Sequence, residues 1–466
     1  MKLNITQIAE AARGRLITGS SEAVITQVSI DSRNAAAGTL FIPLPGMHAD
    51  GHAFIEDAFN NSAGAALVQK GHGVIAKLCG RHADRALIEV VDPLRALGDI
   101  ACCWRSRFAA RVIAITGSNG KTSTKEMLWN ILSRHMPCIK NPGNFNNLIG
   151  LPLSLLPLDG SQQAAILEMG MSERGEISRL AEISRPQIGL ITNVGPAHLA
   201  QLKNLEEIAE AKGELFSYLS GESTAVVNRD DARVVARAKT TRAHIISYGL
   251  DGGDVHASNL RCCAGSGTAF DLHIMGESTT VQLRIPGRHF VSNALAAAAT
   301  AHSLGMSMEQ IKAGLEAYTG VPGRMELVRL GGITILNDAY NANPVSMTAA
   351  LTALSMLTPG NHRIAVLGDM LELGEQSRHY HKELGKTVAG LPIDYLFYTG
   401  EFSSDVREGA LAAGMPGAHL FLSDTLEALT DILQEKLCAG DALLLKGSRK
   451  MNMERVIDLL KIRTEC

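Results

Sequence analysis

The sequence predicts an α/β protein of three domains, and three observations carry this prediction. Short apolar runs typical of buried strands alternate with amphipathic helical patterns through two long stretches, which indicates mostly parallel sheets. The chain has 466 residues, of which 46% are hydrophobic, so several domains can each bury an interior. A Gly-Val-Pro-Gly segment at 320–323 separates the two stretches and is typical of a linker.

The expected boundaries follow from these patterns. We expect a small mixed α/β N-terminal domain over 1–87, a central phosphate-loop domain with a mostly parallel sheet over 88–320, and a Rossmann-like domain over 321–466. Strands are expected at 28–30, 40–43, 65–68, 112–115, 164–167, 188–191, 225–227, 333–336, 364–367, 395–398 and 442–445. Helices are expected at 204–219, 292–303, 308–318, 345–357, 377–389, 424–437 and 451–461.

Charge and cysteine usage exclude several classes of protein. The net charge is −3 with both signs interspersed, which argues against nucleic acid as a partner. The eight cysteines form no C-x-x-C pair, and this usage fits a reducing compartment. No apolar stretch reaches 18 residues, so no membrane insertion is expected. Together these features predict a cytoplasmic protein, with a monomer as the default.

Residues 116–123 read Thr-Gly-Ser-Asn-Gly-Lys-Thr-Ser and carry the clearest chemical signal. An apolar run precedes them and a helical pattern follows, an arrangement that aims backbone N–H groups and a helix dipole at phosphate. Lys121 can neutralise the outer phosphates, and the Thr122 hydroxyl can ligate Mg²⁺. The segment predicts a nucleoside triphosphate site in the short form T-G-x-x-G-K-[TS], because Ile115 stands where the longer pattern has its first Gly.

Two further strands of the central block end in groups that suit a divalent metal. Glu168 ends one strand, and the other leads into Thr192-Asn193-Val194-Gly195-Pro196-Ala197-His198. If the sheet is parallel, Glu168 and His198 share an edge with the phosphate loop. A carboxylate and an imidazole beside a triphosphate favour Mg²⁺ binding. The alternatives are a solvated acid at a strand end and a loop histidine.

Lys212 falls in the apolar stripe of the helix expected at 204–219. A lysine that faces a core is costly unless it is paired or neutral, and burial favours the neutral amine. A neutral amine can react with carbon dioxide to give a carbamate, whose negative charge can ligate magnesium. The alternative is a lysine whose stem packs while its ammonium group reaches water.

Polar segments at other strand ends could bind substrate. Asp338, within Asn337–Pro344, could meet a ribose or a metal-bound water, while the asparagines beside it could cap the next helix. The segments 367–370 and 445–449 could contact a substrate carboxylate or form turns. In the first block Arg33 is a plausible fork for phosphate or carboxylate. The loop at 46–52 and the polar turn at 141–147 could grip a sugar or peptide, or be plain turns.

Taken together, these segments resemble the Mur ligase family of ATP-dependent amide-forming enzymes, in order along essentially the whole chain. The motifs are the short phosphate loop, Leu-Glu-Met-Gly at 167–170, Asn-Val-Gly-Pro-Ala-His at 193–198, Ala-Lys-Gly-Glu at 211–214, Gly-Arg-His-Phe-Val-Ser-Asn at 287–293, and Pro-Gly-Arg-Met-Glu at 322–326. The string Asp-Ala-Tyr-Asn-Ala-Asn-Pro at 338–344 is similar to the branch that adds D-alanyl-D-alanine. The Asp-Asn-Pro-Arg motif of the tripeptide-forming branch is absent.

The resemblance implies a role for each matching residue. ATP would be bound by Gly117, Ser118, Asn119, Gly120, Lys121, Thr122, Ser123, Asn293, Arg324 and Asp338. Two Mg²⁺ ions would be held by Thr122, Glu168, His198 and Lys212, the last as a carbamate formed with CO₂. Lys121, Glu168, His198 and Lys212 would be the catalytic residues. The UDP-linked substrate would be contacted by Ser32, Arg33, Gly46, Asp50, His52, Asn144 and Asn147.

The resemblance also implies a reaction: the carboxylate of UDP-N-acetylmuramoyl-tripeptide attacks ATP, and D-alanyl-D-alanine attacks the resulting acyl phosphate. Closure about 320–323 would bring Arg324 and Asp338 onto ATP. Four alternatives remain: the tripeptide-forming ligase, a folylpolyglutamate synthetase, a P-loop switch or motor, and a non-catalytic nucleotide-binding regulator. A substrate panel with phosphate release separates them.

Overall fold

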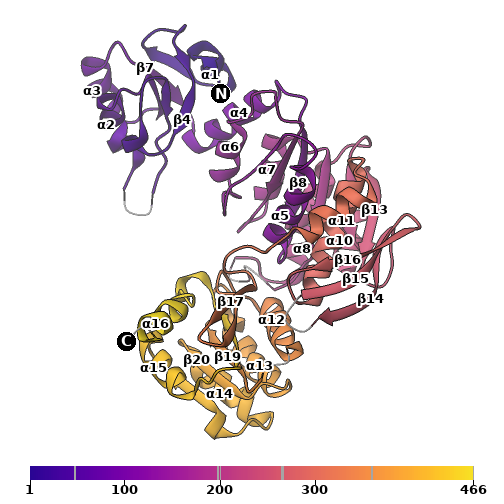
Figure 1. The fold of residues 1–466 in the computed structure, drawn as a ribbon. Coiled ribbons are helices and arrows are strands. Elements are labelled where there is room, and N and C mark those ends of the chain that lie inside the picture. The colour runs from indigo at the N-terminus through magenta and orange to yellow at the C-terminus, as the bar shows by residue number, and fades with distance from the viewer. Residues whose placement is uncertain (47–48, 197–198, 200, 264–266, 358–359, 465–466) are drawn as a thin grey trace. The chain divides into compact units, whose positions relative to one another are not determined.

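The computed structural model describes residues 1–46, 49–196, 199, 201–263, 267–357 and 360–464. It divides into two compact units, each described by itself. The first comprises Met1–Ala114, Met136–Gly189 and Tyr218–Ser223, and the second comprises Ile115–His135, Leu190–Ser217 and Thr224–Cys466. These units do not follow the three expected domain boundaries, which remain a prediction. The α/β class is confirmed, because the strands form four sheets (Figure 1).

The N-terminal part of the first unit is a five-stranded sheet of order β2-β7-β6-β5-β4 with a separate β1-β3 pair. Only β2 runs antiparallel to its neighbour. The expected strands occur here with ends shifted by one or two residues. The elements are β1 (Leu3–Asn4), α1 (Ile5–Ala11), β2 (Arg15–Thr18), β3 (Val24–Ile25), β4 (Gln27–Ser29), η1 (Ser32–Asn34), β5 (Thr39–Phe41), η2 (Gly51–Phe54), α2 (Ile55–Asn60), β6 (Ala65–Gln69), α3 (Val74–Arg81) and β7 (Ala86–Val90).

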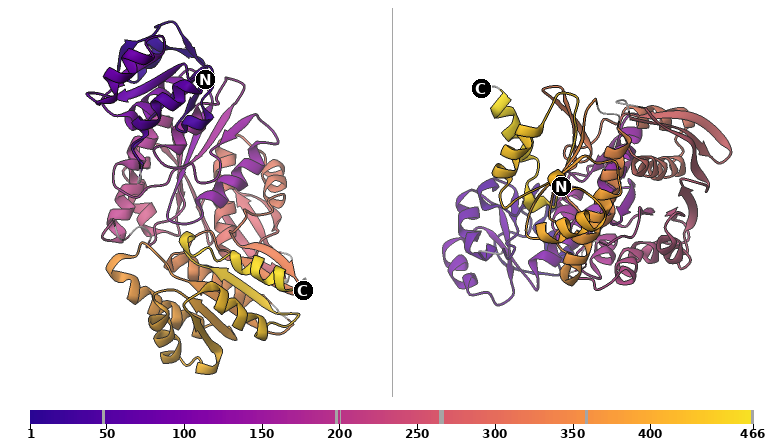
Figure 2. Two further views of the ribbon diagram at one scale, coloured as in Figure 1. Left: turned by 90° about the vertical axis from the view of Figure 1, so that its left-hand side faces the viewer. Right: turned by 90° about the horizontal axis from the view of Figure 1, so that it is seen from below.

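A nine-stranded sheet has the order β16-β15-β14-β13-β12-β11-β8-β10-β9. Its parallel part confirms the expected mostly parallel sheet, whereas β14, β15 and β16 form an unexpected antiparallel ribbon at one edge (Figures 1 and 2). The strands are β8 (Arg111–Thr116), β9 (Cys138–Lys140), β10 (Ala164–Glu168), β11 (Ile188–Ile191), β12 (Thr224–Asn228), β13 (His244–Gly249), β14 (Val255–Cys263), β15 (Gly267–Ile274) and β16 (Glu277–Leu283).

The helices of this region include those expected around the site. Helix α10 begins four residues before the expected start, because Gly287 at φ 122° takes the N-cap position. The helices are α4 (Pro93–Arg105), α5 (Lys121–Leu132), α6 (Gly150–Leu155), α7 (Glu176–Ser184), α8 (Leu205–Tyr218), α9 (Ala232–Ala238), α10 (Arg288–Ser303) and α11 (Met308–Glu316). Within the described ranges, no helix combines the length and apolar character needed to cross a membrane.

The C-terminal part of the second unit is a six-stranded sheet of order β17-β18-β22-β19-β20-β21, parallel except for the edge strand β17. Helices lie on both of its faces, as expected for a doubly wound sheet (Figure 1). The elements are β17 (Glu326–Leu330), β18 (Ile333–Asn337), α12 (Pro344–Met356), β19 (Arg363–Gly368), η3 (Gly374–Gln376), α13 (Ser377–Ala389), β20 (Tyr395–Thr399), α14 (Ser403–Ala412), η4 (Gly417–His419), β21 (Leu420–Ser423), α15 (Leu426–Lys436), β22 (Ala442–Lys446), η5 (Arg449–Met451) and α16 (Arg455–Thr464).

Candidate active site

The phosphate loop is held by the segment that follows β11. The N–H of Asn119 donates to Asn193 Oδ1 at 2.9 Å, and the Asn119 carbonyl accepts from the Thr192 hydroxyl at 2.6 Å. The Ser118 hydroxyl donates to the carbonyl of Gly195 and accepts from its N–H, each at 2.9 Å. Strands β8 and β11 end at the same edge because they are parallel, so the polar segment after β11 lies on the loop.

Two glycines shape the loop so that no side chain fits at either position. A Cβ at Gly117 (φ 146°) would lie 1.9 Å from Thr192 Oγ1, and a Cβ at Gly120 (φ 81°) would lie 2.2 Å from Asn293 Oδ1. Both φ values lie in the region that favours glycine. Asn293, which the sequence predicts to contact the nucleotide, therefore packs directly against the loop.

Helix α5 begins at the loop and supplies the groups that suit phosphate and magnesium. No side chain caps its N-terminus, whose residue Gly120 is left-handed. Thr122 and Ser123 are buried in the first turn, and Lys121 Nζ donates to the carbonyl of Gly117 at 2.7 Å. Backbone N–H groups at a helix start, an ammonium group and a threonine hydroxyl form a donor set that fits a Mg²⁺-bound triphosphate.

Lys212 on α8 is buried, with 2% of the residue exposed. The pKa of its amine lies well below the usual value because of burial, and the nearby charge of Lys121 acts in the same direction. A side chain with its ammonium group in water does not fit this burial. Carbamate formation requires a neutral amine, and the burial of Lys212 favours this form.

Glu168 ends β10 in the first unit and is held by asparagines from the turn at 141–147. Asn146 Nδ2 donates to Glu168 Oε1 at 2.8 Å. The Asn141 side chain accepts from the Glu168 N–H and donates to its carbonyl, both at 2.9 Å. The sequence predicts that two other asparagines of this turn contact substrate. Asn147 Oδ1 accepts from the N–H of Gly150 at 2.9 Å, and Asn144 is exposed. His198 lies outside the described residues.

The C-terminal sheet carries a polar cluster around Asp338. Lys446 Nζ, on a residue 2% exposed, contacts Asp338 Oδ2 at 2.5 Å and the carbonyl of Asn341 at 2.9 Å. The N–H of Met325 donates to Asp338 Oδ1 at 3.1 Å. The Arg324 guanidinium lies 4.1 Å from the centre of the Tyr340 ring. Asp338 and Arg324, the two predicted nucleotide contacts of this part, are therefore fixed by neighbouring backbone and side chains.

In the segments 367–370 and 445–449, Asp369 and Ser448 form hydrogen bonds with neighbouring parts of the protein. Asp369 is buried and accepts from the Tyr398 hydroxyl at 2.7 Å and from the N–H of Glu401 at 2.8 Å. The Ser448 hydroxyl accepts from the N–H of Leu371 at 2.8 Å. Their hydrogen bonds join neighbouring strand ends, which favours the turn interpretation over a substrate contact for these two side chains.

We expect His289, at the start of α10, to stay neutral down to about pH 4. Burial lowers its pKa to about 4, the carboxylate of Asp338 opposes this shift, and the ammonium of Lys446 adds to it. Unfolded chains bind this proton near pH 6.5, so the contribution of His289 to stability falls as the pH drops from about 6.5 to 4. An NMR titration of ring-labelled histidines measures the pKa of His289, and His289→Gln serves as the assignment control. A titration near pH 6.5 would contradict this assignment.

Asp50, at the start of η2, lies between two histidines. In the part of the chain that the structure describes, Asp50, His52 and His72 form the group with a metal-like arrangement, their ligand atoms within 4.8 Å of one another. His52 Nδ1 lies 2.6 Å from Asp50 Oδ1, and His72 Nε2 lies 3.2 Å from Asp50 Oδ2. The other ring nitrogens accept the N–H groups of Gln69 and Val74.

These hydrogen bonds place the ring protons toward Asp50. A metal ion would need the lone pairs of those same nitrogens, so the group fits a hydrogen-bonded cluster better than a metal site. Hydrogen bonds from His52 lower the pKa of Asp50 to about 2. His52 is buried, and the N–H of Gly46 donates to the Ala49 carbonyl at 2.9 Å.

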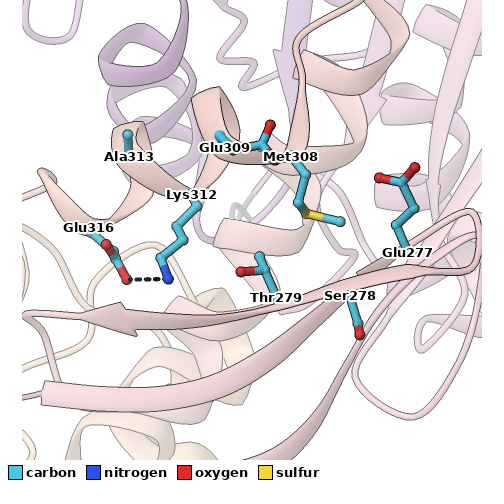
Figure 3. Close-up of a pocket in the computed structure, with 8 residues that line it drawn as sticks. All are labelled: Glu277, Ser278, Thr279, Met308, Glu309, Lys312, Ala313 and Glu316. Carbon is cyan, nitrogen blue, oxygen red and sulfur yellow. Dashed lines mark ion pairs between the residues drawn. The ribbon is translucent and has the colours of Figure 1, made fainter.

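A cavity of about 490 Å³ lies between β16 and α11 (Figure 3). Lys312 and Glu316 on its wall form an ion pair at 3.9 Å. The lining residues are Glu277, Ser278, Thr279, Met308, Glu309, Lys312, Ala313 and Glu316. They include none of the predicted nucleotide, metal or substrate contacts.

Comparison with known proteins gives matches over nearly the whole chain. The Mur ligase family catalytic domain matches residues 24–105, the Mur ligase middle domain 115–301 and the Mur ligase glutamate ligase domain 323–449. A UDP-N-acetylmuramoyl-tripeptide–D-alanyl-D-alanine ligase of Synechocystis is 38% identical over 95% of this chain and 94% of its own. The chain belongs to the Mur ligase family.

Solved structures of Mur ligases agree with this assignment. A crystal structure of MurF from Acinetobacter baumannii matches with a TM-score of 0.89 and 33% identity, covering 99% of both chains. A MurF ligase from Thermotoga maritima in complex with ADP matches with a TM-score of 0.84 and 29% identity, covering 94% of this chain and 98% of that one.

The structure shows hydrogen-bond partners, each within one unit, for candidate site residues, and the sequence had left these partners unassigned. Thr192 and Asn193 brace the phosphate loop, Asn146 binds the Glu168 carboxylate, and Lys446 binds Asp338. All four stand inside or beside the polar segments quoted from the sequence. Their position at strand ends is the signal that marks them, but a sequence does not say which side chain of a turn points back to the sheet.

Proposed function

We propose that this Mur ligase joins D-alanyl-D-alanine to UDP-N-acetylmuramoyl-tripeptide with hydrolysis of ATP, in the synthesis of a peptidoglycan precursor. The similarity to ligases of that name over nearly the full length of both chains supports this function most strongly. The braced phosphate loop and the string at 338–344 support the same conclusion.

The reaction needs two anions to approach each other. A carboxylate oxygen of the tripeptide attacks the γ-phosphorus of ATP, the bond to the β-phosphate oxygen breaks, and ADP leaves. The dipeptide nitrogen then attacks the acyl carbon, phosphate leaves as the C–O bond breaks, and the nitrogen loses a proton. Lys121 stabilises the transferring phosphoryl group, and the loop N–H groups orient it. When bound, Mg²⁺ supplies the remaining positive charge.

The metal and carbamate roles rest on the motifs at 116–123, 167–170, 193–198 and 211–214, which resemble those of the family. Thr122 and Glu168 would hold one Mg²⁺, and His198 and a carbamate on Lys212 would hold the second. The buried amine with a lowered pKa supports the carbamate. Asn293, Arg324 and Asp338 bind the nucleotide, and closure about 320–323 excludes water from the acyl phosphate. The protein acts as a cytoplasmic monomer.

Phosphate release tests the function directly. With ATP, Mg²⁺ and UDP-N-acetylmuramoyl-tripeptide, we expect phosphate release to depend on added D-alanyl-D-alanine and to match amide formation. Release of phosphate from ATP alone would indicate a switch or motor instead. Amide formation with glutamate or a diamino acid, and none with the dipeptide, would indicate another amide ligase.

Arg33→Ala is expected to raise KM for the UDP-linked substrate several-fold and to leave KM for ATP nearly unchanged. The Arg33 side chain is 86% exposed, and its guanidinium is oriented by Asp31 through a 2.7 Å contact, so it can receive an anionic group. Steady-state kinetics with each substrate varied in turn measures the effect. Arg15→Ala, at another exposed ion pair of the same sheet, is the control. A larger rise in KM for ATP would reject the role of this sheet in binding the UDP group.

A further inference from the structure

One hydrogen bond of the second unit joins the phosphate loop to the C-terminal sheet domain. Asn343 Nδ2 donates to Asn119 Oδ1 at 2.7 Å, across 224 positions of sequence. A second contact lies next to it, since a Cβ at Gly195 would lie 3.3 Å from Val345 Cγ2. Gly195 is itself bonded to the loop through Ser118. The first turn of α12 therefore packs on the loop and on its bracing segment.

Asn343 is built to hold this position. Its Oδ1 accepts from the N–H of Ser346 at 2.9 Å, and its own N–H donates to the Ser346 hydroxyl at 3.0 Å. This capping box fixes the side chain, and Pro344 fixes the backbone after it. Because the cap uses only the oxygen of the Asn343 amide, the nitrogen is left to bind Asn119.

Asn119 is equally constrained on the other side. The backbone of Asn119 forms hydrogen bonds with Thr192 and Asn193. The loop cannot shift away from α12 unless these two hydrogen bonds break. The side-chain Nδ2 of Asn119 is buried and has no hydrogen-bond partner in the structure. Asn119 therefore belongs to the loop and also contacts α12, so a movement of either one changes the environment of this amide.

We propose that Asn343 is a positioning residue that docks the C-terminal domain on the phosphate loop through Asn119. We call this pair of side chains the 119–343 contact. It rests on the proposed function, because its role is to keep water from the acyl phosphate until the dipeptide amine attacks. Asp338 and Asn343 belong to one short segment, so the segment that we propose to contact the nucleotide also contacts the loop that we propose to bind the phosphates.

Loss of the 119–343 contact opens a side reaction. Water then attacks the acyl carbon of the acyl phosphate, the C–O bond breaks, phosphate leaves and the tripeptide carboxylate is regenerated. More than one phosphate is released for each amide bond formed. A residue that only stabilises the fold would lower the amount of active enzyme without changing this ratio.

The test is Asn343→Ser in the full-length enzyme, because serine keeps an N-cap oxygen but cannot reach Asn119. We expect kcat/KM for the dipeptide to fall about three- to tenfold, as for the loss of one hydrogen bond. The ratio of phosphate to amide should rise above one. Ser346→Ala weakens the same cap without removing the 119–343 contact, and its ratio should stay at one.

Asn119→Ala and the double variant complete the cycle. If the 119–343 contact carries the effect, the double variant should lose no more than either single variant. Asn119→Ala also serves as the test if Asn343→Ser does not fold, which thermal unfolding reveals. A ratio of one and unchanged kcat/KM in both single variants would overturn the inference. Wild-type enzyme that shows no dipeptide-dependent phosphate release would instead reject the proposed function.

Discussion

Lys121→Ala is expected to abolish formation of the acyl phosphate, with a fall in kcat of at least about a hundredfold. Lys121 begins α5 and contacts the carbonyls of Gly117 and Ser118 at 2.7 and 3.3 Å, so its charge lies at the loop that we propose to bind the phosphates. Without this charge, the tripeptide carboxylate meets the full repulsion of the γ-phosphate. Trapping of the acyl phosphate by hydroxylamine, with rapid-quench measurement of ADP, measures this step.

A surface lysine provides the matched control for Lys121. Lys312→Ala removes an equal charge from a side chain that is 38% exposed and pairs with Glu316 at 3.9 Å. Its rate should equal that of the wild type. If Lys121→Ala turned over at a rate near the wild type, the loop would have no role in phosphoryl transfer, and the proposed chemistry would be rejected.

Lys212→Ala is expected to be nearly inactive and to regain activity with added formate or acetate. The side chain is buried and the pKa of its amine lies well below normal, which favours the neutral amine that attacks the carbon of CO₂. Removing the lysine would take away the proposed carbamate, and a small carboxylate could enter the space left behind and replace the carbamate oxygens. Activity is measured against carboxylate concentration, together with a ¹³C NMR carbamate signal from ¹³CO₂ in the wild type.

Two further variants separate the carbamate from a structural lysine. Lys212→Arg introduces a permanent positive charge and cannot form a carbamate, so it should be inactive. Lys121→Ala should not be rescued by the same carboxylates, because it lacks a cation. An absent ¹³C signal, together with no rescue of Lys212→Ala, would leave the lysine with a packing role only.

Most of the fold follows from apolar periodicity, and the exceptions share one cause. The C-terminal sheet strands are buried runs such as Ile364–Leu367 and Ala442–Leu445, which are easy to recognise. Strand β15 alternates buried and half-buried residues and β16 is mostly exposed, so neither strand carries a long buried run. Helix α14 buries only Val406, Gly409 and Ala410, which is too narrow a stripe to predict a helix.

The candidate site is predictable in outline because parallel strands end at one edge. This rule placed the segment at 192–195 beside the phosphate loop, and the hydrogen bonds of Asn119 agree. It could not distinguish the asparagines at 141–147, where Asn146 turns to Glu168 while Asn147 binds backbone N–H groups of α6. Such choices depend on side-chain rotamers and turn geometry, which local sequence does not determine.

The buried ammonium of Lys446 holds the loop after β18, which we propose to contact the nucleotide, in one shape before any ligand arrives. Because it contacts the Asp338 carboxylate and the Asn341 carbonyl together, this loop needs little reordering on binding. An inhibitor designed against this surface would meet a preformed shape rather than a flexible one. A substitution of Lys446 that lowers the affinity for the inhibitor would leave the Asp338 carboxylate without its partner. The same substitution would therefore lower the stability of the enzyme.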